Sequence, residues 1–190
     1  RATAGRFLHA AQGGRGVLRQ CGHGLEGRGE AVLDRIVQAL RQAVGAGGGG
    51  LRKLGRVVAN DNFAPIARES IGDASIELAT VYIGLHHVPL DQLQAYLQSL
   101  ARIVKPGGLL IVRDHDVTDD AMRALVALAH AVFNAGLGVS WDVNNRELRH
   151  FRTVDAWIAM LREVGFEHIG DRLLQAHDPT LNTLLCFRRA

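Results

Sequence analysis

Two short polar stretches of the sequence carry side chains that can exchange protons near neutral pH. The first is Leu85-His86-His87, after the apolar run 76–83, and the second is Asp114-His115-Asp116, after the apolar run 109–113. A histidine titrates near neutrality, and a carboxylate beside it suits the ring to accept a proton. We therefore predict that His115 and Asp114 are catalytic. The alternative is structural: this stretch only ends a strand, and Asp116 caps the following helix.

The elements that must position these side chains alternate between strand and helix along most of the chain. The run 76–83 is apolar on both faces, as is typical of a strand covered on both sides. In chain order we predict strand 56–59, strand 76–83, a helix from Asp91 to 104 that ends at Pro106-Gly107-Gly108, strand 109–113, helix 119–135, helix 154–164, and strands 168–175 and 182–188. The alternation predicts an α/β fold with a mostly parallel sheet and helices on both faces.

The last two strands differ from the others because only a short Asp-Pro-Thr turn, residues 178–180, separates them. A link this short requires an antiparallel pair. The helix at 91–104 should instead join strands 76–83 and 109–113 as parallel neighbours. Ligands of such sheets bind outside the carboxyl ends of the parallel strands. Both polar stretches should therefore lie at the same edge of the sheet.

The N-terminal part of the chain has a different composition. Residues 1–55 are rich in glycine, with one helical pattern at 30–44, whereas the regular pattern occupies residues 56–190. Glycine loses much conformational freedom on folding, so we predict that residues 1–55 are an atypical or partly mobile segment of one domain. The chain does not begin with Met, so we expect residues before Arg1.

Composition excludes several classes of protein. The 190 residues are 47% hydrophobic, which is typical of a globular domain, and the formal charge of only +3 makes nucleic acid an unlikely partner. No apolar run approaches the roughly 20 residues of a membrane helix, and no signal peptide is visible. Cys21 and Cys186 have no paired spacing, so we expect a reducing cytoplasm and no structural zinc site.

Three stretches together resemble a known family. SIELATVYIGLHHV, LARIVKPGGLLIVRDHD and TVDAWIAMLREVGF, followed by a closing antiparallel strand, resemble the C-terminal half of class I S-adenosylmethionine-dependent methyltransferases. The resemblance covers residues 73–190. It implies a Rossmann-like fold, S-adenosylmethionine as cofactor, and methyl transfer to a small-molecule or protein acceptor.

The resemblance also implies which residues bind the cofactor. Cys21-Gly22-His23-Gly24 resembles the glycine-rich turn of the family, so Gly22 and Gly24 are expected to approach the cofactor, and Asp61 resembles the acid that binds the ribose. The alternatives are a flexible glycine segment and an Asx-turn residue. The acid normally ahead of the turn is missing, and the chain between Gly24 and Asp61 is longer than the family's pattern.

Further site residues follow from the same resemblance. Leu85 and His86 are expected to line the cofactor, and His87 and Trp141 the substrate, because the segment that contains Trp141 lies where the family builds its acceptor lid. Imidazole and carboxylate groups also suit a metal, but the family often carries this histidine pair without one, so no metal is expected. We expect His130 to pack or face solvent.

Two other functions remain open at this point. The degenerate glycine-rich half favours a methyltransferase-like domain that has lost its cofactor and serves as a binding or scaffolding module. A nucleotide-binding oxidoreductase is the weaker alternative. What occupies the glycine-rich crevice would discriminate among the three.

Overall fold

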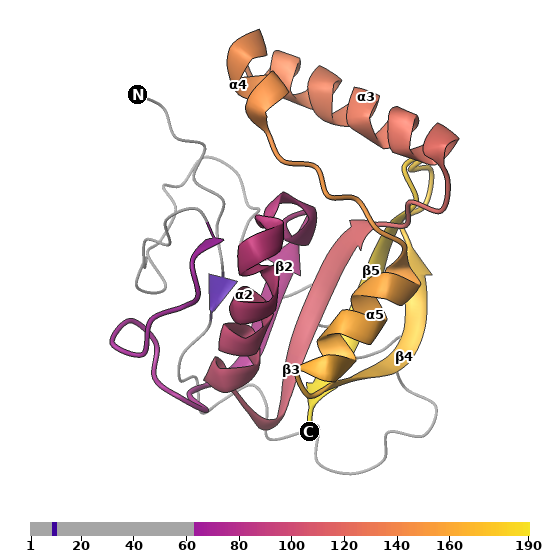
Figure 1. Cartoon of the computed structure of the whole chain (residues 1–190). Coiled ribbons are helices and arrows are strands. Elements are labelled where there is room, and N and C mark those ends of the chain that lie inside the picture. Colours follow the sequence, from indigo (N-terminus) through magenta and orange to yellow (C-terminus); the bar gives the residue numbers. More distant parts are fainter. Residues whose placement is uncertain (1–8, 11–62) are drawn as a thin grey trace, which may run out of the picture. The chain divides into compact units, whose positions relative to one another are not determined.

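The computed structural model describes residues 9–10 and 63–190, which form a sheet with helices (Figure 1). The predicted strand 56–59 and the glycine-rich segment lie outside the described residues. In chain order the elements are β1 His9–Ala10, β2 Ile76–Tyr82, the 3-10 turn η2 Leu85–His87, α2 Leu90–Ile103, β3 Val104–His115, α3 Asp120–Gly136, α4 Trp141–Arg146, α5 Val154–Glu163, β4 Phe166–Leu174 and β5 Asn182–Arg189.

The described strands form one mixed sheet in the order β1-β2-β3-β5-β4. β2 and β3 are parallel neighbours, and β5 runs antiparallel to both β3 and β4, so these predicted pairings are confirmed. The α/β class is likewise confirmed. Within the described sheet, however, β2–β3 is the one parallel pair, since β1 also pairs antiparallel to β2. The described part is therefore mixed rather than mostly parallel.

One hydrophobic core joins two helices to the sheet. In Figure 1, α2 and α5 lie on the same face of the sheet. The sequence predicted helices on both faces, and within the described residues these two helices confirm the prediction for one face only. Alternate residues of β3 and β5 point toward these helices, because side chains of a strand alternate between its faces. The largest fully buried core side chains include Leu97, Leu100, Leu110, Trp157, Leu161, Leu185 and Phe187. Trp157 thus lies fully buried in this core.

The Pro-Gly-Gly stretch lies inside β3 and does not precede it, which corrects the predicted strand boundary. β3 begins at Val104, directly after α2, and Ile76 pairs with Val104 whereas Leu78 pairs with Leu109. β3 therefore bulges between these pairs. Gly107 has a φ of 76°, which glycine adopts without strain. The bulge sets the register that brings Arg113 opposite Tyr82 and places the end of β3 beside the end of β2.

The helix ends agree with the sequence in part. Asp119 accepts a hydrogen bond from Met122 N (2.8 Å) as the N-cap of α3, and Thr153 caps α5 as predicted. Asp91 is not the N-cap of α2; it lies in the first turn, after Pro89. The Asn-rich loop contains a short helix, α4, that the sequence did not predict, because six residues are too few for a clear periodic pattern.

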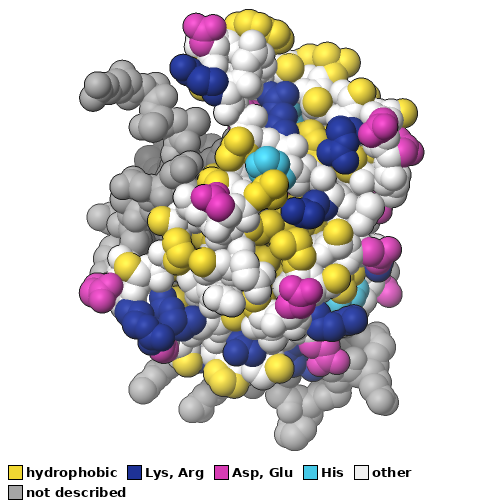
Figure 2. All heavy atoms as spheres, in the orientation of Figure 1, with side chains coloured by type: hydrophobic (Ala, Val, Ile, Leu, Met, Phe, Trp, Pro, Cys, Tyr) yellow, Lys and Arg dark blue, Asp and Glu magenta, His cyan; other side chains and the backbone are white. Residues whose placement is uncertain are grey.

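α3 and α4 form an excursion beyond the end of β3, and hydrophobic side chains are visible over them in Figure 2. Val126 is the one residue of α3 that is fully buried, whereas Leu128, Val132 and Phe133 are mostly exposed. Among the described helices, none has the length and hydrophobicity that crossing a bilayer requires.

Candidate active site

The carboxyl ends of β2 and β3 lie side by side, which confirms that the two polar stretches share one edge of the sheet. Ile83 N donates to Arg113 O (2.7 Å) where β2 ends. Ile83 has a φ of 48°, in the left-handed region that a β-branched residue rarely adopts. Such strain costs about 1–3 kcal/mol and is common at functional sites. The turn directs the chain into η2, which carries His86 and His87.

Four imidazoles gather at this edge, and we call His86, His87, His115 and His130 the histidine cluster. The ring centroids of His86 and His87 are 4.0 Å apart, and those of His86 and His130 are 4.9 Å apart. His115 and His130 are separated by 5.4 Å. His86 is fully buried, and Phe151 packs against the rings of His86, His115 and His130. Bulk water is thus largely excluded from the cluster.

Hydrogen bonds assign the protons on three of the four rings. Nδ1 of His86 donates to Asp114 Oδ1 (2.6 Å), and Nδ1 of His87 donates to Leu148 O (2.6 Å). Nδ1 of His115 lies 3.0 Å from Thr180 O. Because a carbonyl oxygen can only accept, Nδ1 of His87 and of His115 must carry a proton, and the carboxylate favours the same tautomer of His86. In their neutral forms, Nε2 of each of these three rings therefore carries a lone pair, and that of His115 faces Nε2 of His130 (3.3 Å).

His130 is a site residue that sequence reasoning missed. Its Nε2 lies 3.3 Å from Nε2 of His115, and its side chain is 12% exposed. Val126, His130 and Asn134 follow one another at helical spacing on α3, and Asn134 also bonds inward, to Asn144 and Glu147. The available signal was this spacing, which places two polar residues on the same face of the helix as its one buried residue.

Burial keeps two of the rings neutral at pH 7. Burial, together with the neighbouring rings of His86 and His115, lowers the pKa of His130 to about 4. Burial also lowers the pKa of His115, although the Thr180 carbonyl and the Asp114 carboxylate oppose the shift. Both rings are therefore available as proton acceptors or ligands at neutral pH.

Asp114 holds His86 rather than the ring of His115. One carboxylate oxygen, Oδ1, accepts from His86 Nδ1 and from the backbone N of His115 (2.8 Å). The other oxygen, Oδ2, is buried without a hydrogen-bond partner in the described part of the chain. Asp116 has a separate role, since its Oδ1 accepts from Val154 N (2.8 Å) at the start of α5. It thus supports α5 and not the next helix, α3.

A second network connects the excursion to the cluster. Glu147 Oε1 lies 3.8 Å from His87 Nδ1, and Oε2 lies 3.9 Å from His130 Nδ1. Arg149 binds the same carboxylate (3.2 Å) and also donates to Ala127 O on α3 and to Asn144 on α4. His87 and His130 therefore share one carboxylate near Nδ1 of each ring.

Of the remaining predicted site residues, the two that the structure describes, Leu85 and Trp141, are not part of the cluster. Gly22, Gly24 and Asp61 lie outside the described residues. Leu85 is buried within the hydrophobic core, and Trp141 is 68% exposed at the first position of α4. Their roles toward cofactor and substrate remain predictions.

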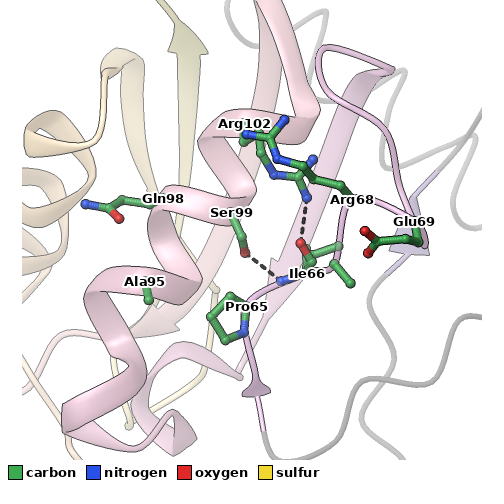
Figure 3. Close-up of a pocket in the computed structure, with 9 residues that line it drawn as sticks. Pro65, Ile66, Arg68, Glu69, Ala95, Gln98, Ser99 and Arg102 are labelled. Carbon is green, nitrogen blue, oxygen red and sulfur yellow. Dashed lines mark hydrogen bonds between the residues drawn. The ribbon is translucent and has the colours of Figure 1, made fainter.

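The hollow drawn in Figure 3 is a different place, beside α2, and its volume is about 620 Å³. Two of its polar side chains are already bonded: Ser99 Oγ accepts from Ile66 N (3.0 Å), and Arg102 donates to Ile66 O and Asp73. These bonds attach the segment before β2 to α2. The hollow therefore has a structural explanation, and the histidine cluster is the better candidate site.

Comparison with known proteins decides the family. A family model described as a methyltransferase domain matches residues 32–169, well over half of the chain. The chain belongs to this methyltransferase family. The match includes α2, β2, β3 and every member of the histidine cluster. No curated protein gives a significant match.

One solved structure agrees at the level of the fold, and two further similarities are weaker. The 1,6-didemethyltoxoflavin-N1-methyltransferase of Burkholderia thailandensis, with S-adenosylhomocysteine bound, is 16% identical with a TM-score of 0.51, over 86% of this chain and 68% of that one. An O-methyltransferase family protein from the same organism is 23% identical with a TM-score of 0.45, over 70% and 35%. LepI in complex with SAM is 14% identical with a TM-score of 0.42, over 60% and 26%. The chain thus spans about a third of the length of the O-methyltransferase family protein and about a quarter of the length of LepI.

Proposed function

We propose that the chain transfers a methyl group from S-adenosylmethionine to a small-molecule or protein acceptor, and that His115 removes a proton from the acceptor. The observation that supports this role is the state of His115. Its Nδ1 is bound to Thr180 O, burial lowers its pKa, and its Nε2 is left as an unprotonated acceptor at the carboxyl end of β3. Ligands of parallel strands bind at this edge.

S-adenosylmethionine supplies a methyl group that its sulfonium already activates, so the protein mainly positions the acceptor and accepts its proton. Gly22, Gly24 and Asp61 would hold this cofactor, with Leu85 and His86 beside it. Within the described residues the fit is partial, because the side chains of Leu85 and His86 are buried. A cofactor at this turn would therefore contact its backbone.

The acceptor would approach His115 from the side of α3 and α4. His130 now lies against Nε2 of His115, so a proton from an acceptor can reach that nitrogen only if the His130 ring turns away. The exposed Trp141 at the start of α4 offers an aromatic surface to such an acceptor. We do not expect nucleic acid to be a partner of this chain.

The His115→Ala variant tests this role. We expect it to keep its fold and its affinity for S-adenosylhomocysteine while the rate of methyl transfer falls about 100-fold or more, the usual contribution of a general base. The measurement is S-adenosylhomocysteine released from S-adenosylmethionine with a panel of hydroxyl, amine and peptide acceptors. His150→Ala is the matched control, because the backbone N of this histidine donates to His86 O (2.7 Å) while its side chain makes no hydrogen bond or ring contact with the cluster in the described structure.

A loss of only a few-fold in His115→Ala would contradict proton removal and leave His115 with a role in positioning. A folded wild-type chain that binds no S-adenosylhomocysteine would support the alternative, a methyltransferase-like binding module without cofactor.

A further inference from the structure

Three members of the histidine cluster are arranged as ligands of a metal ion. One ring nitrogen from each of His86, His87 and His130 lies within 4.8 Å of the others. Nitrogens bound to one tetrahedral zinc ion lie about 3.3 Å apart, so modest rotation of the rings would close the set. Three buried imidazoles beside a fourth, half-buried one are unusual without a reason, since histidine is usually only partly buried.

The second observation is a buried nitrogen with no partner. His86 is fully buried, and its Nε2 makes no hydrogen bond within the described residues. A buried polar atom without a partner is costly, and such an atom in a native structure calls for an explanation such as an ion. Its lone pair is free because Nδ1 donates to Asp114.

The groups behind the rings match those behind metal-binding histidines. Such histidines almost always donate their other N–H to a carboxylate or a backbone carbonyl, which fixes the ring. His86 does so to Asp114, and His87 does so to Leu148 O. Glu147 Oε2 lies 3.9 Å from Nδ1 of His130, within reach of a small rotation. Each of the three rings thus has an acceptor on its far side.

We propose that His86, His87 and His130 bind one divalent transition-metal ion of the zinc class, and that the fourth position of this ion is open. Neutral imidazole suits zinc, cobalt and nickel, whereas magnesium and calcium require oxygen ligands. Three protein ligands with an open position are typical of catalytic zinc. This inference replaces the sequence-based expectation of no metal, and it does not depend on cofactor binding.

The ion would also explain how His115 becomes available. When His130 turns to the ion, its Nε2 leaves Nε2 of His115. The following step rests on the proposed function. An acceptor hydroxyl bound at the open position loses its proton to His115, its oxygen bonds to the methyl carbon, and the carbon–sulfur bond breaks with its electron pair going to sulfur. A bound cation lowers the pKa of such a hydroxyl.

The test uses the full chain without an affinity tag, stripped with a chelator and then titrated with zinc and with cobalt. We expect one equivalent of either ion to bind and the cobalt adduct to show the intense visible absorption of a four-coordinate site. Magnesium should compete with neither ion. His87→Gln and His130→Gln should each weaken zinc binding by about 100-fold or more, since even the loss of a residue behind a ligand costs 10–100-fold.

His150→Ala is the matched control and should bind zinc as the wild-type chain does, because its side chain is not in the ligand group. Circular dichroism of each variant, and the cobalt spectrum of the wild-type chain, keep the test valid if a variant folds poorly. Weak binding without defined stoichiometry, or equal affinity in His87→Gln, His130→Gln and wild type, would overturn the proposal. A separate titration with S-adenosylhomocysteine distinguishes this failure from failure of the proposed function.

Discussion

At the scale of single residues, the chemistry of the site depends on which ring nitrogen each histidine leaves free. Asp114, Leu148 and Thr180 accept from Nδ1 of three different rings, so the lone pairs of these rings are all on Nε2. Asp114 is the one carboxylate among these acceptors, and it also accepts from a backbone N–H. We infer that it positions His86 and the end of β3 and does not itself exchange protons with a substrate.

Asp114→Ala should therefore destabilise the fold. It leaves His86 Nδ1–H and the His115 backbone N–H buried without their acceptor, and each such group costs about 1–3 kcal/mol. Urea denaturation of the variant and wild type measures the free energy of unfolding. Asp171→Ala is the control; Asp171 is exposed, so we expect a change within about 0.5 kcal/mol. Equal effects of the two substitutions on the free energy of unfolding would show that the hydrogen bonds of the Asp114 carboxylate do not stabilise the fold.

At the scale of elements, the periodic parts of the sequence predicted the structure well. α2, α5, β2 and β5 were predicted nearly at their observed positions, because continuous apolar strands and amphipathic helices give clear patterns over enough residues. The bulge in β3 was not predicted, since a Pro-Gly-Gly stretch reads as a turn whenever its hydrogen-bonding partners are unknown.

The candidate site was predictable only where it follows strand ends. His86, His87, Asp114 and His115 follow predicted strands, and the rule for ligands at carboxyl ends places them together. His130 could not be placed in the same way, because only the fold of the excursion α3–α4 brings it back to this edge. The partners of the rings, such as Leu148 O and Thr180 O, are backbone atoms that no side-chain pattern reveals.

Gly165, which ends α5, tests the account of the elements. It has a φ of 90°, and a Cβ there would meet the Arg189 guanidinium, which donates to Gly165 O (2.8 Å) and Ala101 O (3.0 Å). Gly165→Ala should cost about 1–2 kcal/mol for the left-handed conformation and about 1 kcal/mol more for these displaced hydrogen bonds. Thermal and urea denaturation measure the loss.

Gly170 is the matched control, because its φ of 74° is similar but no atom lies within 4 Å of the position that a Cβ would take there. Gly170→Ala should show only the cost of the left-handed conformation. If both substitutions destabilise the chain equally, Arg189 moves aside without cost. Its hydrogen bonds between β5 and the end of α5 then do not stabilise the fold.

At the scale of the whole molecule, the family match and the strand order together establish the family and the fold of the chain. The match runs across residues 32–169, and β2, α2 and β3 form the parallel crossover whose carboxyl edge carries the histidine cluster. The resemblance to class I S-adenosylmethionine-dependent methyltransferases is confirmed for family and fold. The cofactor-binding residues Gly22, Gly24 and Asp61 stay predictions, as they lie outside the described residues.

The most direct measurement is calorimetric titration of the full chain with S-adenosylhomocysteine, S-adenosylmethionine and NAD, on protein whose folding is checked by circular dichroism. The account predicts binding of both sulfur compounds at one shared site and no heat with NAD, because the family match is to a methyltransferase domain. A folded chain that binds neither sulfur compound, or that binds NAD in their place, would contradict the proposed methyl transfer.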